Sequence, residues 1–111
     1  MITATTEGFA LSGDMTFLQA NLWLEKGKAR FTSHTSNLIS LDLSALGKLD
    51  SSALAVVFGW MRALQKEGKT LVLNAPPTDL LSLGQMYGIS AMLPLAATDT
   101  DTDTDTDTDT A

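Results

Sequence analysis

The chain has 111 residues, which is enough for one compact domain and too few for two. Its formal net charge is −6, but six of the thirteen acidic residues alternate with Thr between Asp99 and Asp109, which leaves seven acidic against seven basic residues elsewhere. A domain of zero net charge lacks the positive surface that binds DNA, RNA or an anionic membrane. The charge balance therefore argues against nucleic acid as a partner.

The chain has no cysteine, which excludes disulfides and thiolate chemistry and is consistent with a reducing compartment. The first seven residues lack both the basic start and the apolar run of a secretory signal. A bilayer span needs about 20 apolar residues, and the longest apolar stretch here, residues 53–61, is far shorter. We therefore expect a cytoplasmic protein with no direct membrane insertion.

The beginning of the chain predicts a hairpin and then a helix. Two short runs, residues 2–6 and 9–12, flank the dipeptide Glu7-Gly8, which suits a tight turn between strands. Gln19 follows Thr16 at the spacing of a capping box, so the helix is expected to open at Thr16.

The pattern of the first helix predicts how its residues are arranged and where it ends. Phe17, Asn21 and Leu24 would lie along one edge of the helix, with Leu18 and Leu22 beside them. Gly27 lies among basic residues, a composition typical of a helix C-terminus. The polar residues 31–37 are then expected to form a loop.

A strand, a helix and a second strand are predicted in the middle of the chain. Apolar residues occupy alternate positions in residues 38–44, the period of a half-buried strand. A turn at Gly47 is expected next, followed by a helix from about residue 51 to residue 67 and a buried strand over residues 70–74. A strand–helix–strand unit of this kind predicts a right-handed parallel crossover.

The remaining residues predict one more helix and a tail. Thr78 is expected to cap a helix that ends at Gly88, which gives the element order β-β-α-β-α-β-α. Residues 98–111 repeat Thr and Asp without an apolar face and repel one another electrostatically. We therefore expect a single α/β domain over residues 1–97 and a disordered tail over residues 98–111.

Motifs for catalysis and metal binding are missing from the sequence. The single histidine, His34, lies in a polar segment with no cysteine or second histidine to complete a metal site. Gly47-Lys48 resembles the end of a phosphate-binding loop, but Leu49 stands where that loop requires Ser or Thr. We therefore expect no catalytic residue, no metal and no cofactor, so the protein is not expected to be an enzyme.

The start of the long central helix is the best candidate for a functional site. Asp50, Ser51 and Ser52 are all suited to the N-cap, where a side-chain oxygen accepts a bond from an unpaired helical N–H. One interpretation is that they only cap the helix. The other is that an exposed hydroxyl here serves as a docking or phosphorylation point, since a phosphate is favourable at the positive end of a helix.

The same helix carries more apolar residues than one buried face requires. One stripe contains Leu54 and Val57, and a second stripe beside it contains Val56 and Trp60. The second stripe either completes the core or forms a partner surface, because Trp is a frequent interface anchor. Both interpretations are left open by the sequence.

Two segments carry a family resemblance. Residues 41–44, a short turn and then Asp50-Ser51-Ser52-Ala53-Leu54 resemble the signature of the STAS domain. Residues 68–71, the double proline after Asn74 and the segment 86–89 resemble the MlaB-like branch of that family. The resemblance covers about residues 2–93 and implies an α/β STAS fold, with a small mixed β-sheet and helices packed mainly on one side.

The resemblance also implies a role and a site. MlaB-like proteins are cytoplasmic accessory subunits of an ABC transporter for phospholipid, where they bind the ATPase subunit and lie peripheral to the inner membrane through that complex. In the related anti-sigma-factor antagonists, a partner kinase phosphorylates the serine that corresponds to Ser51. Ala53 stands where many antagonists have glycine, which weakens the phosphorylation reading. We therefore expect Asp50, Ser51, Ser52 and Ala53 to meet a protein partner, with the ATPase ahead of the kinase.

The predicted tail leads to a direct test. Deleting residues 98–111 is expected to leave the melting temperature unchanged, because a self-repelling polar repeat contributes nothing to a packed core. Thermal unfolding of the full and the shortened chain measures the difference. A drop of many degrees on truncation would mean that the tail packs against the domain.

Overall fold

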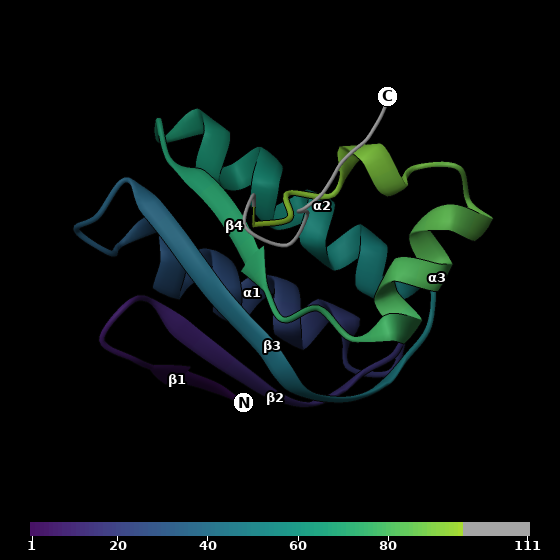
Figure 1. Ribbon diagram of the computed structural model, residues 1–111. Helices are drawn as coiled ribbons and strands as arrows, with labels where there is room; N and C mark the ends of the chain where they lie inside the picture. Colours follow the sequence, from purple (N-terminus) through teal and green to yellow (C-terminus); the bar gives the residue numbers. More distant parts are fainter. Residues whose placement is uncertain (97–111) are drawn as a thin grey trace.

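The computed structural model describes residues 1–96, so residue 97 and the tail predicted at 98–111 lie outside the described residues (Figure 1). A four-stranded sheet and three α-helices follow one another in the predicted order. Their bounds are β1 (Ile2–Ala4), β2 (Phe9–Met15), α1 (Ala20–Thr32), β3 (Leu38–Leu49), α2 (Ser52–Lys66), β4 (Thr70–Asn74) and α3 (Thr78–Met86), and a 3₁₀ turn (Ser90–Met92) follows them.

The sheet is mixed and its strands lie in sequence order, β1-β2-β3-β4. β1 runs antiparallel to β2, with Ile2 opposite Leu11, so the predicted hairpin is confirmed. β2 with β3 and β3 with β4 pair in parallel, each pair joined through a helix, so the predicted parallel crossover is confirmed as well.

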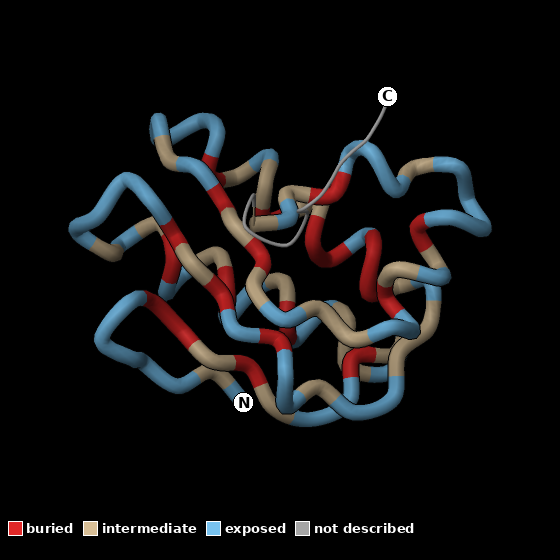
Figure 2. Tube along the Cα trace, in the orientation of Figure 1, coloured by how far each residue is buried: buried red, intermediate tan, exposed pale blue. Residues whose placement is uncertain are grey.

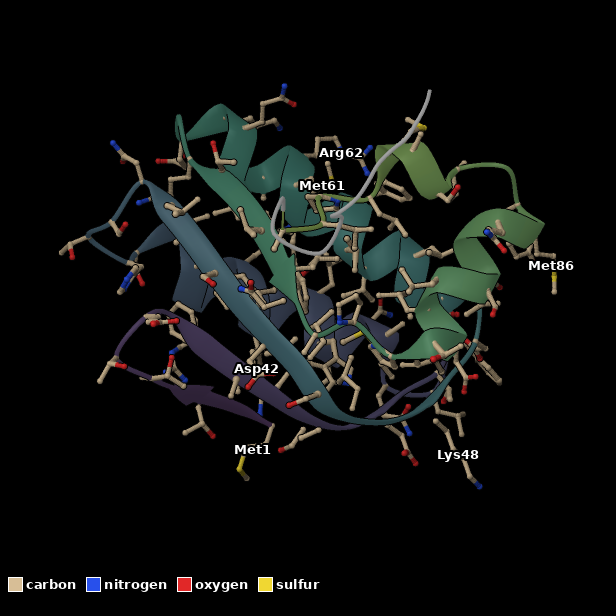
Figure 3. The ribbon with its side chains drawn as sticks, in the orientation of Figure 1. Met1, Asp42, Lys48, Met61, Arg62 and Met86 are labelled. Carbon is tan, nitrogen blue, oxygen red and sulfur yellow. The ribbon has the colours of Figure 1, made fainter. Side chains whose placement is uncertain are left out.

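The helices cover one face of this sheet. Figure 1 shows α1 and α2 side by side behind the strands, with α3 beyond one end of the sheet. Residues of β3 alternate between the covered and the open face of the sheet. Ile39 and Leu41 are buried under the helices, whereas Asp42 is exposed on the strand (Figure 3). The α/β fold that the resemblance implies, a small mixed sheet with helices mainly on one side, is the fold observed.

The core lies between the sheet and the two central helices. In Figure 2 the buried segments of β2, β3 and β4 lie beside one another and face the buried turns of the helices. Trp60 and Phe31 are its largest fully buried side chains, and their rings meet edge to face with centroids 5.1 Å apart. Aromatic pairs of this geometry add to the stability that burial alone provides.

The first helix differs from the prediction in its bounds, and the structure shows which face it buries. It begins at Ala20 and continues through Gly27 to Thr32, so the predicted ending near Gly27 and the loop from residue 31 are wrong. The stripe that it buries is Trp23, Gly27 and Phe31, at a spacing of four residues. Trp23 and Phe31 offer more apolar area than the residues of the predicted edge, so burying them is more favourable.

The central strand is longer than predicted, and the turn expected at Gly47 is absent. β3 extends to Leu49 because β2 also continues, to Met15, and supplies a pairing partner along the whole length. The register shifts twice between these strands, and the Asp14 side chain accepts a hydrogen bond from the Lys48 backbone N–H, with Oδ1 and N 2.8 Å apart. A side chain from the neighbouring strand thus holds the residues that the sequence suggested as a turn.

The second half of the chain has the predicted elements, although Pro77 and not Thr78 occupies the N-cap of α3, and Thr78 is the first residue of that helix. α2 falls within residues 51–67, and β4 has the predicted bounds. Beyond α3, the chain returns to the outer edge of β4, where the Leu73 N–H donates to the Pro94 carbonyl and the Ala96 N–H donates to the Leu73 carbonyl. The edge strand β4 is therefore paired on both sides at Leu73.

α1 and α2 meet closely at Gly27. A Cβ added to Gly27 would lie 2.3 Å from Nε1 of the Trp60 indole, which is far inside contact distance. The same Nε1 donates a hydrogen bond to the Leu24 carbonyl, with N and O 3.2 Å apart. The missing side chain at Gly27 therefore lets the largest core residue of α2 lie directly against the backbone of α1.

Replacing Gly27 with alanine is expected to lower the free energy of unfolding by about 1–3 kcal/mol, because the added methyl overlaps a rigid, fully buried ring. Gly59→Ala is the matched control, since its Cβ would meet only the flexible Leu24 side-chain end at 2.6 Å. Both changes gain the same helix propensity, so urea unfolding of the two variants isolates the overlap. A Gly27→Ala variant as stable as the wild type would contradict this packing.

Candidate functional site

The start of α2 is organised by Asp50, the residue that follows β3. Asp50 Oδ1 accepts a hydrogen bond from the Ser52 N–H, with O and N 2.8 Å apart. Of the three cap candidates in the sequence, the carboxylate thus performs the capping, and Ser51 forms no side-chain cap bond. The Ser51 hydroxyl therefore lies exposed at the first turn and forms no cap bond with it.

The other oxygen of the same carboxylate fixes a distant loop. Asp50 Oδ2 accepts a hydrogen bond from the Phe17 N–H, with O and N 3.0 Å apart and 33 residues of chain between them. The loop is also closed on itself, because Gln19 Oε1 accepts bonds from the Thr16 N–H and the Thr16 hydroxyl at 2.9 and 2.7 Å. This partly fulfils the predicted capping box, although α1 itself begins only at Ala20. The residues before α1 are thereby held beside the start of α2.

These bonds also set the charge at the site. The N–H of Phe17, and to a smaller extent the bonds from Ser52, hold the pKa of the Asp50 carboxyl below its usual value. The carboxylate is therefore fully ionised at neutral pH. A second negative group on Ser51 would lie beside this charge.

Phe17 and Leu18 lie before α1, contrary to the prediction that they belong to the helix, and both are exposed. Their exposed fractions are 69% and 77%, and Ser51 is exposed as well. Large apolar side chains that a small domain leaves in water are frequent at protein contacts. We name Phe17, Leu18, Asp50 and Ser51 the helix-start surface, a charged and hydroxyl-bearing helix end beside two apolar side chains.

Several residues expected at a partner surface are buried instead. Ala53 and Trp60 have no exposed area and Val56 is 2% exposed, so the structure favours the interpretation that this stripe completes the core. They lie on the face of α2 that packs against α1 and the sheet, where their apolar area is removed from water. Ser52 is half-buried, and its N–H is already bonded to Asp50.

The position of Phe17 and Leu18 in the sequence could have indicated that they are exposed. Two adjacent apolar residues, Phe17 and Leu18, lie inside the span that the Thr16 and Gln19 side chains close, which is the region before the first full helical turn. Residues there do not share the buried helix stripe, so their exposure follows once the helix is started at Ala20.

His34 lies away from this surface. Its ring meets the ring of Phe9 edge to face, with centroids 5.2 Å apart, and its carbonyl accepts a hydrogen bond from Lys69 Nζ. These contacts give the histidine a packing role at the opposite end of β3. No helix within residues 1–96 has both the length and the apolar character needed to cross a bilayer.

A comparison with known protein families agrees with this geometry. The family described as "Mlab, STAS domain" matches residues 3–94, which is nearly all of the described chain. The chain belongs to this family. The curated protein "Intermembrane phospholipid transport system binding protein MlaB" from Haemophilus influenzae is 31% identical over 70 residues, which cover 62% of this chain and 67% of that protein.

Two solved structures share the fold of this STAS domain. The anti-sigma factor antagonist SpoIIAA in its unphosphorylated form superposes with a TM-score of 0.65 at 19% identity, over 89% of each chain. A putative anti-sigma factor antagonist from Thermotoga maritima superposes with a TM-score of 0.69 at 16% identity, over 89% of this chain and 88% of that one. The STAS fold inferred from the sequence is thereby confirmed.

Replacing Asp50 with alanine is expected to lower the free energy of unfolding at pH 7, because two backbone N–H groups lose their acceptor. The folded pKa of Asp50 lies below the unfolded value of about 3.9, so its contribution is present above that pH and is lost as pH falls through the folded pKa. The deficit of the variant should therefore be largest at neutral pH and shrink below about pH 4.

Urea unfolding at pH 7 and pH 3 measures this deficit. Ser51→Ala is the matched control, because its hydroxyl caps nothing and its removal should change stability at neither pH. A deficit of Asp50→Ala that stays constant between the two pH values would mean that the ionised carboxylate is not what holds the loop.

Proposed function

We propose that this STAS domain is a cytoplasmic, non-enzymatic accessory subunit of an ABC transporter for phospholipid between membranes. It docks on the ATPase subunit of that transporter and is thereby held at the inner membrane. The membership of the chain in the MlaB-type family and the name of its Haemophilus influenzae relative support a role in this transport system.

The observation that carries the proposal is the helix-start surface. Phe17 and Leu18 provide exposed apolar area, while Ser51 provides an exposed hydroxyl that forms no cap bond at the helix start. Fully burying a side chain such as leucine in a contact contributes about 1.5–3 kcal/mol, which is ample for an anchor residue. Asp50 holds both parts in one arrangement before the partner arrives, which reduces the entropy lost on binding.

Ser51→Glu is expected to abolish co-purification with the transporter ATPase. The new carboxylate would lie at the centre of the contact, beside the ionised Asp50, and would be costly to remove from water. Thr35→Glu is the matched control, because it places the same charge on an exposed residue at the other end of β3. Circular dichroism on both variants verifies the fold. Undiminished binding by Ser51→Glu would exclude this helix start as the docking point.

Leu18→Ser tests the apolar half of the surface independently. The loss of its apolar area should raise the Kd for the ATPase about tenfold or more. Met86→Ser is the matched control, because Met86 is 73% exposed, against 77% for Leu18, and projects from α3 into solvent (Figure 3). If only Met86→Ser weakened ATPase binding, the contact surface would lie on α3 and not at the helix-start surface.

A second candidate function is that of an anti-sigma-factor antagonist regulated by phosphorylation of Ser51. The fold shared with two antagonists and the exposed hydroxyl at the start of α2 favour it. A phosphate there would be attracted by the helix dipole and repelled by Asp50, so it would alter a contact rather than unfold the domain.

One experiment separates the two candidates. The purified chain is incubated with the transporter ATPase and, separately, with an anti-sigma kinase and ATP. Stable complex formation with the ATPase and no phosphate on Ser51 supports the accessory subunit. Phosphorylation of Ser51 without any ATPase complex would contradict the accessory-subunit proposal and support the anti-sigma-factor antagonist.

A further inference from the structure

A solvent-open cavity lies between α1 and the β1–β2 edge of the sheet. Its volume is about 580 Å³, within the range of about 300–1,000 Å³ that small-molecule sites occupy. Successive turns of α1 supply Trp23, Lys26 and Arg30 to one wall, while Ile2 and the residues 12–14 form the other. None of these residues belongs to the helix-start surface.

The inner part of this cavity is apolar. Trp23 is 7% exposed, and its Nε1 donates a hydrogen bond to the Asp14 carbonyl, with N and O 2.8 Å apart. This bond satisfies the only polar atom of the indole, so what remains for a ligand is ring surface. Leu22 and Ile2 add aliphatic surface beside it.

Two cations from one face of α1 line the same cavity. Lys26 and Arg30 are four residues apart, the spacing that brings side chains together on a helix. Within residues 1–96 neither forms an ion pair. Arg30 lies over the ring of Phe9, 5.3 Å from its centroid, and donates one long bond to the Ile2 carbonyl, so most of its five donors remain available.

One carboxylate also lines the cavity, and it is engaged elsewhere. Asp14 Oδ1 accepts the hydrogen bond from the Lys48 N–H that holds the end of β3. The lining thus combines an apolar floor with three positive groups, Lys26, Arg30 and the Met1 ammonium, against the single Asp14 carboxylate. A ligand that matches both features has an apolar body and one negative head.

We propose that this cavity binds a small amphiphilic organic anion. Its carboxylate or phosphate head lies between Lys26 and Arg30, and its apolar body lies against Trp23 and Leu22. The Arg30 guanidinium can bind either head through two N–H groups, because its planar fork fits the oxygens of carboxylates and phosphates. Burial of the apolar body supplies the remaining affinity.

The test uses the two tryptophans as separate reporters in ¹H–¹⁵N spectra. The Trp23 indole N–H lies at the cavity, whereas the Trp60 indole is fully buried between α1 and α2. Sodium decanoate and decyl phosphate, added below their micelle concentrations, should shift the Trp23 signal and leave the Trp60 signal in place. The tighter of the two identifies the preferred head. Decanol and decyltrimethylammonium are the neutral and cationic controls and should bind at least about tenfold more weakly.

Charge-removing variants test the head site. Lys26→Gln with Arg30→Gln should raise the Kd for the better anion about tenfold, and Lys26→Gln alone should raise it in the same direction. Lys28→Gln is the matched control on the same helix, because Lys28 lies outside the cavity lining and pairs with Glu25. An unshifted Trp23 signal, equal affinity for decanol, or an unchanged Kd in the double variant would each overturn the proposal.

Discussion

The contact between Trp60 and Gly27 is the constraint on which the arrangement of this domain depends. A fully buried indole occupies the space of an absent side chain, donates to the Leu24 carbonyl and meets Phe31 edge to face. These contacts fix how closely α1 and α2 approach and join them into one layer. Because that layer covers one face of the sheet, the start of α2 lies at the edge of the packed core, beside the loop that precedes α1.

Asp50 connects this packed arrangement to the surface of the domain. It follows the longest strand, caps the helix that carries Trp60 and binds the backbone before the helix that carries Gly27. One carboxylate thus joins three elements of the core at the point where an exposed serine and two exposed apolar side chains come together. The rigidity of the interior is what gives this part of the surface a defined shape.

The sequence predicted those parts of the fold that depend on local patterns. The alternation in Ile39, Leu41 and Leu43 indicated β3, and Gly68, observed with a positive φ of 72°, marks the end of α2 as expected. The errors arose where tertiary contacts override local signals. Gly27 lies among basic residues as at a helix end, but in the structure it is the point where α1 contacts Trp60. Residues 45–49 extend the strand only because β2 lies alongside them. The local pattern predicted that Ser51 is exposed at the helix start. It could not predict the hydrogen bond between Asp50 and Phe17, because these residues are 33 positions apart in the chain.

The return of the chain along β4 has a consequence for self-association. An unpaired edge strand offers its N–H and C=O groups to any other strand, and folded proteins avoid this hazard by covering or shortening their edges. Here residues 94–96 occupy the backbone groups of Leu73 at one edge, and β1, at the other edge, has only three residues. A strand added at the β4 edge would have to displace the bonds at Leu73, and a strand added at the other edge would find only three residues of β1, so the domain is poorly suited to joining other copies edge to edge.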